Sequence, residues 1–345
     1  MGKETVSIYT IAKEAGVSPA TVSRVLTGNA KVSKEKKTKV ETLIQKYDFR
    51  PNALARGLSN VQTKIIGLMV ADIRNPFYAT MAVECEKAAN ENGYLLLLCN
   101  SLGSNEMEMS YLDKFSGQRV DAVIQIGGKV DELVSDPCYV DNINKLANTM
   151  PVLITGKLDG ADCYRINIDE GQSMELLMQY LIENGHRDIA LVGGRDNVKS
   201  TFDKRQRYRQ MLNKYGISVR EDYIIDGSSY DIESGRDAMN RFIHNVSPVP
   251  NAIIAINDFT AVGIIRTLWE RGYRIPDDIS VVSFDNTYIA ETCMPRLTCV
   301  GYDYRQFGKK LIETAIQAIH NEEPPHMQMV KSQLVIRDSC KRIQE

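Results

Sequence analysis

Residues 11–28 read IAKEAGVSPATVSRVLTG, two short stretches with helical apolar spacing on either side of a tight AGVS joint. We expect Thr10 to cap the first helix, because a hydroxyl at that position can accept a hydrogen bond from the first turn. Gly16 supplies the backbone freedom that a sharp turn needs. The pattern therefore predicts two short helices joined at a steep angle.

The second helix is predicted to begin at Ser18 as N-cap, with proline at the first helical position, where proline is favoured. Val22, Val25 and Leu26 follow helical spacing, so this face is expected to be buried. The opposite face carries side chains of the kinds that read a DNA groove: Pro19, Ala20, Thr21, Ser23 and Arg24.

A third helix is predicted after Ser33, which can cap it, because apolar residues recur at Val40, Leu43, Ile44 and Tyr47. Three short helices around one small core form a helix-turn-helix domain. A generic helical hairpin can show the same spacing, so the motif alone leaves both interpretations open.

Charge separates this head from the rest of the chain. Residues 1–60 contain 11 basic and five acidic residues, whereas the whole chain has a net charge of −2. A basic head on an acidic body is typical of a polyanion-binding module attached to another domain. The alternative for a single run such as KEKKTK at 34–39 is a solvated helix face.

The segment FRPNALARGLSN at 49–60 connects the head to the body. Asn52 to Leu58 has room for about two helical turns, which is too short for a stable isolated helix, and Gly57 weakens it further. The segment is either a plain linker or a hinge that becomes helical only when it is held.

Together, VSPATVSRVLTG, FRPNALARGLSN and KIIGLMVADIRNPFY resemble the lactose-repressor/galactose-repressor family of bacterial transcription regulators. The resemblance implies that the second helix enters the major groove of a palindromic double-stranded operator and that the hinge helices of a homodimer pair in the minor groove, with Leu58 as a wedge between bases. The residues that it implies at the DNA are Tyr9, Ser18, Pro19, Ala20, Thr21, Ser23, Arg24, Asn29, Asn52, Ala55, Arg56 and Leu58.

From residue 64 onward, short apolar strands alternate with helices in two series, which predicts an α/β body with two doubly wound parallel sheets. The second series is expected to open with RINI at 165–168. The expected domains are the head at 1–50, the hinge helix at 51–63 and an effector-binding core at 64–345. Within the core we expect a first lobe at about 64–162 plus 294–322 and a second at about 163–293 plus 323–340, as in periplasmic-binding-protein-like folds.

Polar residues follow several of the predicted strands, where ligands of open α/β sheets bind. Carboxylates and amides can bind paired sugar hydroxyls, and an aromatic face can stack on a sugar ring. Asp258 is equally suited to cap the next helix, and the aromatic residues are equally suited to the core. The resemblance favours Asn257 and Asp285 as ligands. The candidates at strand ends are Asp72, Asn75, Phe77, Asn257 and Asp285.

The resemblance also implies a pocket cation near DKRQRYRQML at 203–212, and either Lys204 or Arg205 can fill that role. After the fourth strand, where some sugar-binding members have an aspartate, this chain has Gly156-Lys157. Additional cations and one carboxylate fewer favour an acidic or phosphorylated sugar-like effector. The alternative is that 203–212 is a basic surface helix.

The remaining patterns argue against several other classes. The sequence has no phosphate-binding or nucleophile-elbow motif and no metal-ligand spacing among its four histidines, so we expect neither an enzyme nor a cofactor or metal. Seven scattered cysteines, no signal peptide and no apolar run long enough to cross a bilayer favour a cytoplasmic protein. We expect a repressor with a small sugar-like effector; the alternative is control by a protein partner such as a phosphorylated carrier protein.

Overall fold

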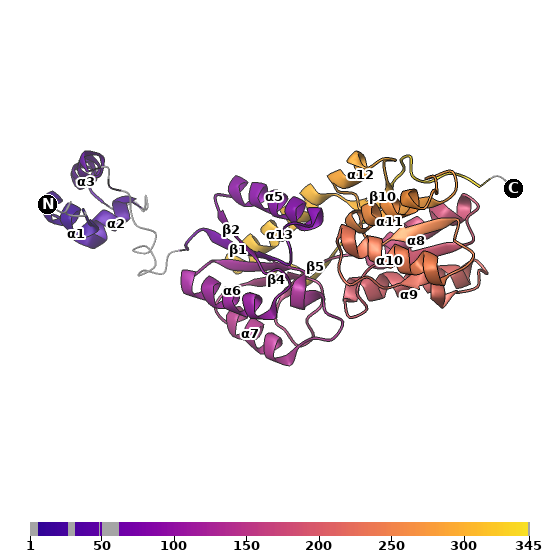
Figure 1. Ribbon diagram of the computed structural model, residues 1–345. Helices are drawn as coiled ribbons and strands as arrows, with labels where there is room; N and C mark the ends of the chain where they lie inside the picture. Colours follow the sequence, from indigo (N-terminus) through magenta and orange to yellow (C-terminus); the bar gives the residue numbers. More distant parts are fainter. Residues whose placement is uncertain (1–5, 27–31, 48, 50–61, 344–345) are drawn as a thin grey trace. The chain divides into compact units, whose positions relative to one another are not determined.

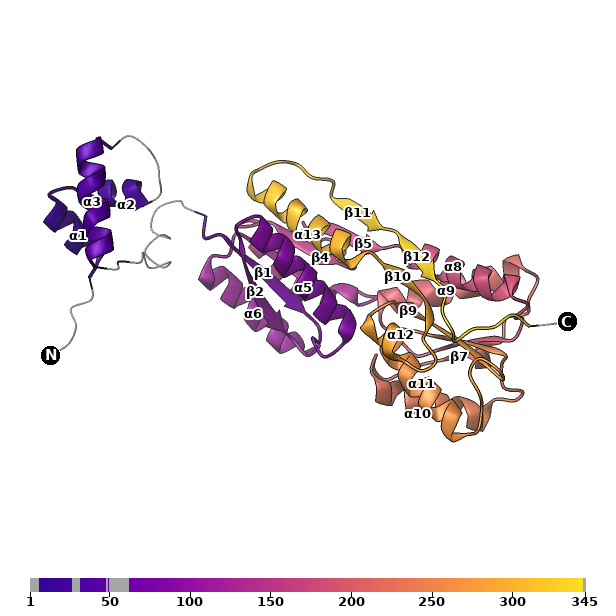
Figure 2. The same ribbon diagram turned by 90° about the horizontal axis from the view of Figure 1, so that it is seen from above.

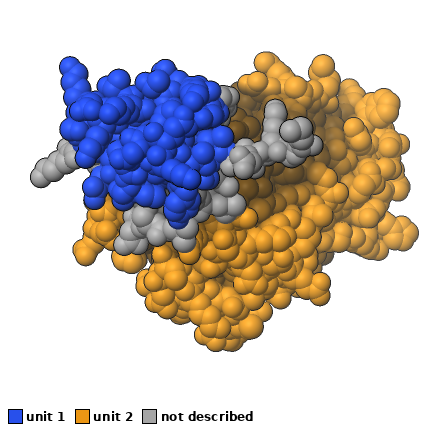
Figure 3. Space-filling model, turned by 90° about the vertical axis from the view of Figure 1, so that its left-hand side faces the viewer, with its two compact units in different colours: residues 1–63 blue, residues 64–345 orange. Residues whose placement is uncertain are grey.

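A computed structural model describes residues 6–26, 32–47, 49 and 62–343. The chain divides into two compact units, Met1–Thr63 and Lys64–Glu345 (Figure 3). Most of the predicted hinge at 51–63 lies outside the described residues, as do five of the residues expected at the DNA: Asn29, Asn52, Ala55, Arg56 and Leu58.

The head consists of α1 (Ile8–Ala15), α2 (Pro19–Leu26) and α3 (Lys34–Lys46), shown in indigo in Figure 1. Its small core holds Ile11, Ala12, Val22 and Val40, which are all buried. This arrangement matches the helix-turn-helix that the apolar spacing predicts.

Of the two other helix caps predicted in the head, one was wrong and one is confirmed in position only. Ser7, not Thr10, is the N-cap of α1: its hydroxyl accepts a hydrogen bond from the Thr10 N–H (3.3 Å), and the Thr10 hydroxyl accepts one from the Ser7 N–H (3.2 Å). This reciprocal capping box lets the helix begin several residues earlier. Ser33 occupies the N-cap position of α3 but makes no capping hydrogen bond with its side chain.

The turn between α1 and α2 has the predicted geometry. Gly16 adopts a left-handed conformation with φ of 67°, which glycine tolerates without steric cost. The Ser18 hydroxyl then accepts a hydrogen bond from the Thr21 N–H (3.2 Å) at the start of α2.

In the core, the first lobe contains a six-stranded sheet in the order β11-β5-β4-β3-β1-β2, with all neighbours parallel. Helices α5 and α13 cover one face of this sheet, and α6 and α7 cover the other. The elements are β1 (Ile65–Val70), α5 (Pro76–Glu91), β2 (Leu95–Asn100), α6 (Asn105–Gln118), β3 (Ala122–Ile126), the 3-10 turn η1 (Gly128–Asp131), α7 (Pro137–Ala147), β4 (Val152–Thr155), β5 (Tyr164–Ile168), α13 (Tyr304–Ile319) and β11 (Met327–Val330).

The second lobe contains a sheet in the order β12-β10-β9-β8-β6-β7, parallel except for β12, which runs antiparallel to β10. Helices α8 and α9 pack on one face, and α10 and α11 pack on the other. The elements are α8 (Glu170–Glu183), β6 (Ile189–Val192), α9 (Lys199–Lys214), η2 (Glu221–Tyr223), β7 (Ile224–Ile225), α10 (Ile232–Asn245), β8 (Ala252–Ala255), α11 (Asp258–Glu270), β9 (Ser280–Asp285), α12 (Tyr288–Thr292), β10 (Thr298–Tyr302) and β12 (Ser332–Val335).

The chain crosses between the lobes three times, after β5, after β10 and between β11 and β12 (Figure 2). Three strand assignments therefore differ from prediction. Residues 165–168 join the first sheet, between β4 and β11, instead of opening the second series. The strand at 298–302 belongs to the second sheet although 294–322 was assigned to the first lobe, and the strand at 327–330 belongs to the first sheet although 323–340 was assigned to the second lobe. Apolar strands of the two lobes look alike, and only pairing with a neighbour decides the sheet to which each belongs.

Helices begin directly after two of these crossovers. Asp169 caps α8 by accepting a hydrogen bond from the Gln172 N–H (2.9 Å), and Asp303 caps α13 by accepting one from the Gln306 N–H (2.9 Å). Helix α13 packs beside α5 of the first lobe, whereas β10, which precedes it, lies in the second. Among the described residues, no helix is both long and apolar enough to span a bilayer.

Candidate functional site

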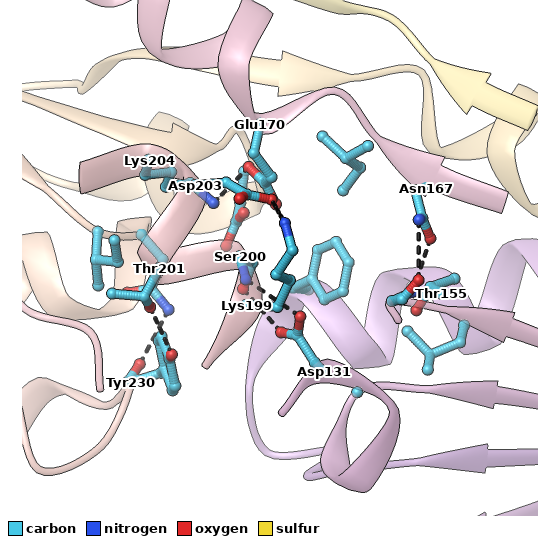
Figure 4. A pocket seen from close by; sticks show the side chains of 18 of the residues that line it. Asp131, Thr155, Asn167, Glu170, Lys199, Ser200, Thr201, Asp203, Lys204 and Tyr230 are labelled. Atoms are coloured by element: carbon cyan, nitrogen blue, oxygen red, sulfur yellow. Dashed lines mark hydrogen bonds and ion pairs between the residues drawn. The ribbon is translucent and has the colours of Figure 1, made fainter. Parts of the chain in front are cut away.

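A cavity of about 190 Å³ lies between the two lobes of the core, at the ends of several strands (Figure 4). Both lobes contribute to its wall, as expected for a site beyond the carboxyl ends of parallel strands. Its polar and aromatic lining includes Asn75, Phe77, Tyr78, Asp131, Thr155, Lys157, Asn167, Glu170, Lys199, Ser200, Thr201, Asp203, Lys204, Tyr230, Asn257, Asp285 and Tyr302.

Five of the seven residues predicted for the effector line this cavity: Asn75, Phe77, Lys204, Asn257 and Asp285. Asp72 and Arg205 lie outside its wall. The Asp72 carboxylate pairs with Arg74 at 2.7 Å, and this contact lowers the pKa of the carboxyl. The Arg205 guanidinium pairs with Asp226 at 2.6 Å and donates to the backbone carbonyls of Gly193 and Gly194.

The difference between Lys204 and Arg205 follows from helix geometry. Successive residues of α9 point about 100° apart, so only one of them faces the cavity. The Lys204 ammonium lies 2.5 Å from the Glu170 carboxylate and 4.9 Å from the centre of the Phe284 ring. Burial raises the pKa of Glu170, and the charge of Lys204 opposes that shift. The predicted pocket cation is therefore neutralised within the cavity wall.

Other lysines of the cavity have partners too. Lys199 pairs with Asp203 on the same helix, and Lys157 pairs with Asp159 at 2.7 Å. The other cations of the 203–212 segment are Arg207 and Arg209, which pair with Glu175 at 2.7 Å and Glu221 at 2.6 Å and do not line the cavity. Each of these cations is thus paired with a carboxylate of the same chain.

Asp285 ends β9 in a left-handed conformation with φ of 95°, which is rare for a residue with a side chain. The Tyr302 hydroxyl donates to its carboxyl oxygen (3.2 Å), and the Tyr304 hydroxyl donates to its backbone carbonyl (2.9 Å). Burial, followed by the nearby Asp258, raises the pKa of Asp285 to about 8. A carboxyl group that keeps its proton at neutral pH can both donate to and accept from a hydroxyl.

Aromatic rings pack around this carboxyl. Phe77 makes edge-to-face contacts with Tyr302 and Tyr304, at centroid distances of 6.3 and 6.0 Å. The ring lies in the cavity wall and also packs against the first-lobe core. Both sequence interpretations of Phe77, as core and as cavity lining, are thus compatible with its position.

The two predicted amides serve as helix caps as well. The side-chain oxygen of Asn75 (Oδ1) accepts from the Phe77 N–H (3.0 Å) at the start of α5. The side-chain oxygen of Asn257 (Oδ1) accepts from the Thr260 N–H (2.7 Å) at the start of α11, and the side-chain Nδ2 donates to the Tyr230 backbone carbonyl (3.0 Å).

Asp258 neither caps α11 nor lines the cavity, since Asn257 is the cap. The Asp258 side chain is buried and accepts hydrogen bonds from the Ser283 hydroxyl (2.5 Å) and from the backbone and hydroxyl of Thr287 (2.7 and 3.0 Å). It therefore joins α11 to the end of β9.

Sequence reasoning missed several cavity residues, notably Asp131, Asn167, Glu170, Ser200 and Tyr230. Asn167 comes from the end of β5 and Asp131 from the η1 turn that follows β3, and the strand-end rule applies to both positions. Tyr230, whose hydroxyl lies 2.8 Å from that of Thr201, comes from a loop without a sequence signal.

After β4, where some sugar-binding members of the family have an aspartate, the geometry of this chain requires a glycine, Gly156. Its φ of 140° is unfavourable for other residues, and a Cβ atom there would lie 2.0 Å from the Val130 carbonyl oxygen. The Asn167 side chain closes the turn by accepting from the Gly156 N–H (2.7 Å) and donating to its carbonyl (2.9 Å). The η1 turn thus occupies the space that a side chain would need.

In the head, the predicted groove-facing residues lie on the outer side of α2. Ser18, Pro19, Ala20 and Arg24 are exposed, Thr21 and Ser23 are half-buried, and Val22 points into the core. Tyr9, at the start of α1, is 71% exposed. Glu14 ties α1 to α3 by accepting hydrogen bonds from Lys46 and Tyr47, each at 2.7 Å.

Comparison with known proteins decides the family. Residues 7–52 match the bacterial regulatory proteins of the lacI family, and residues 178–340 match the periplasmic binding protein-like domain. Catabolite control protein A of Staphylococcus epidermidis is 32% identical over 327 residues, which cover 93% of this chain and 95% of that protein. The chain belongs to the lacI family of bacterial regulatory proteins.

This lacI-family regulator is 34% identical to catabolite control protein A of Priestia megaterium over 297 residues, which cover 86% of this chain and 87% of that protein. Its fold matches the Lac repressor dimer bound to operator and an anti-inducer, with a TM-score of 0.86 at 23% identity, over 98% of this chain and 100% of that one. It also matches a complex of the transcriptional regulator CelR with cellobiose, with a TM-score of 0.71 at 25% identity, over 97% and 100% of the two chains. The protein is therefore a DNA-binding transcription regulator with an α/β core.

Proposed function

We propose that this regulator is a repressor that binds a palindromic operator as a homodimer and responds to a small sugar-like effector in the interlobe cavity. The observation that carries the proposal is the combination of exposed side chains on the outer face of α2 with a cavity between the lobes that is lined by polar and aromatic residues. In this proposal the chain has no catalytic role and needs no cofactor.

The DNA-binding part is tested by anisotropy with a labelled palindromic duplex. If the basic heads of two subunits neutralise six to ten phosphates, affinity falls by about 10³–10⁵ between 50 and 200 mM salt. Arg24→Ala should relax base preference, since arginine on this face suits guanine. Arg274→Ala removes an exposed arginine that pairs with Asp278 in the second lobe of the core; it is the matched control and should leave binding unchanged. A salt-independent affinity contradicts the proposal.

The hinge part concerns residues 52–58, for which we retain the proposal of a helix that forms on the operator, with Leu58 as the wedge. Inserting an apolar side chain unstacks a base step at a cost of a few kcal/mol, and the resulting bend permits more contact. Leu58→Ala should therefore reduce DNA bending and specific affinity, with little change in non-specific affinity. A Leu58→Ala variant that bends DNA like the parent identifies the segment as a plain linker.

The homodimer is supported by the outer surface of α5, β2 and the turn after β2, where four apolar side chains are exposed: Val83 (47%), Leu95 (64%), Leu98 (40%) and Leu102 (54%). Strand β2 is also the edge of the first sheet. Exposed apolar surface of this kind marks interaction sites. Leu95→Glu should shift the protein to monomers in sedimentation velocity, whereas Val134→Glu, at another exposed site, should not.

The effector part rests on the cavity. Its volume is below the roughly 300–1,000 Å³ of drug-sized pockets, which favours a compact ligand such as a single sugar ring. The paired lysines favour a neutral sugar, whereas an acidic or phosphorylated effector would have to separate Lys204 from Glu170 or Lys199 from Asp203.

A thermal-shift screen of sugars, sugar acids and sugar phosphates tests this part. A ligand at about 100 times its Kd stabilises the fold by roughly 2.7 kcal/mol, and Asp285→Ala should abolish that shift. If no compound shifts the melting temperature of the parent, control by a protein partner such as a phosphorylated carrier protein becomes the better explanation.

A further inference from the structure

The end of the η1 turn and the two residues after it contact the second lobe through hydrogen bonds beside the cavity. The Leu133 N–H donates to the Asn197 carbonyl (2.8 Å), and Glu132 and Val198 form an isolated antiparallel bridge. We call residues 131–133 with 197–200 the clasp. It is separate from the three chain crossovers, so it can open without breaking the connection between the lobes.

Asp131 makes the side-chain contact of the clasp (Figure 4). Its carboxylate accepts from the Ser200 hydroxyl (2.7 Å) and from the Ser200 N–H (3.3 Å), which is near the start of α9. Both residues also line the cavity. The contact therefore holds the two lobes together at the edge of the space that an effector would fill.

The buried carboxylate of Glu108 is hydrogen-bonded to the backbone of the η1 turn. Glu108 of α6 is 1% exposed, and its oxygens accept from the Lys129 N–H (3.2 and 3.4 Å), from the Gln125 side chain (2.9 Å) and from the Ser101 hydroxyl (3.4 Å). Burying a carboxylate is costly unless hydrogen bonds compensate. The hydrogen bond from the Lys129 N–H connects this buried carboxylate to the η1 turn, so Glu108 can hold the backbone of η1 in one conformation.

The fit between Glu108 and the turn is close. Gly128, with φ of 73°, follows β3 at a point where a Cβ atom would lie 2.1 Å from the Glu108 carboxyl oxygen. The side-chain oxygen of Gln125 (Oε1) in turn accepts from the Tyr139 hydroxyl (2.8 Å). The network therefore extends from α7 through β3 and α6 to the turn that presents Asp131.

We propose that the Asp131–Ser200 contact sets the closure of the lobes over the cavity, and that Glu108 is a positioning residue that holds the η1 turn for this contact. That the cavity is the effector site rests on the proposed function. Lobe closure does not require a ligand, so the two proposals fail separately.

Hydrogen exchange of the full-length protein without ligand tests the clasp. In the parent, peptides covering 128–135 and 195–201 should be protected. Hydrogen bonds to a charged group are among the stronger ones, so Asp131→Ala should speed exchange in both peptides by about tenfold or more. Ser200→Ala keeps the backbone N–H donor and should have a smaller effect in the same two peptides.

Glu132→Gln is the matched control, because Glu132 is the neighbouring carboxylate but pairs with Lys129 of its own lobe at 3.1 Å. It should leave both peptides at the parent rate. Parent-like exchange in Asp131→Ala overturns the clasp, and so does an equal increase in Glu132→Gln.

Glu108→Met tests the positioning role by removing the acceptors of the Lys129 N–H. It should speed exchange at 128–135 by about tenfold, while Glu108→Gln, which keeps one acceptor oxygen, should restore nearly the parent rate. A general loss of protection across α6 and β3, without rescue by glutamine, would assign Glu108 to the core alone. If Glu108→Met does not fold, the exchange rate of Glu108→Gln decides. A parent-like rate at 128–135 in Glu108→Gln, together with fast exchange in Asp131→Ala, supports the positioning role of Glu108. Faster exchange of Glu108→Gln elsewhere in the first lobe overturns that role.

Discussion

Asn257→Ala separates the structural and the ligand-binding roles of a residue that lines the cavity. The Asn257 side chain is 5% exposed, accepts from the Thr260 N–H at 2.7 Å and donates to the Tyr230 carbonyl at 3.0 Å. Loss of an N-cap costs about 0.5–2 kcal/mol, and a buried group left without its partner costs about 1–3 kcal/mol. These effects overlap in part, so we expect the free energy of unfolding to fall by about 2–4 kcal/mol.

Thermal melting of the ligand-free protein, followed by circular dichroism, measures this loss. For a domain of this size, 2–4 kcal/mol corresponds to a decrease in Tm of about 5–10 °C. Asn257→Ser is the matched control, because serine keeps an oxygen for the Thr260 N–H and loses only the donation to Tyr230. Its Tm should lie between those of the parent and Asn257→Ala.

A melting temperature of ligand-free Asn257→Ala within about 1 °C of the parent would refute the capping argument. If the same variant also lost the response to an effector that stabilises the parent, Asn257 would act through the ligand. A lower Tm with a retained ligand response would assign the side chain to the fold.

Three further changes have defined outcomes. Gly263→Ala should destabilise the core by about 1–3 kcal/mol in urea unfolding, because its Cβ would lie 2.0 Å from the Ile232 carbonyl oxygen where α10 and α11 touch. Lys204→Met should cost about 3–5 kcal/mol, since it leaves Glu170 buried without the cation 2.5 Å away, and adding Glu170→Gln should recover much of the loss. Burial raises the pKa of Asp258 to about 6 from an ordinary value of 3.8, so the protonated carboxyl stabilises the fold fully below pH 4, and this stabilisation is lost as the pH rises through 6. In urea titrations, the free energy of unfolding of the parent minus that of Asp258→Asn should therefore decrease by up to about 3 kcal/mol between pH 4 and pH 7.

The elements of this protein could be predicted from the sequence because they depend on nearby residues. The helix-turn-helix follows from apolar spacing around Gly16, and the core strands follow from short apolar runs between helices. Caps were less predictable: Ser7 replaces Thr10 at α1 because a second hydroxyl three residues later completes a reciprocal pair. The strand-end rule placed Asn257 and Asp285 in the cavity wall, since every parallel strand of a sheet ends at the same edge.

The sequence alone determined a basic helix-turn-helix head, a two-sheet α/β core and part of the cavity wall, because each depends on local periodicity and on strand direction. Only the tertiary structure decided which sheet the strands at 165–168, 298–302 and 327–330 join, since pairing is a long-range choice between similar apolar strands. It also decided that Lys204 faces the cavity with Glu170 as its partner, and that Asp131 meets Ser200 across the lobes. Those contacts join residues far apart in the chain, and no local pattern specifies their distance or direction.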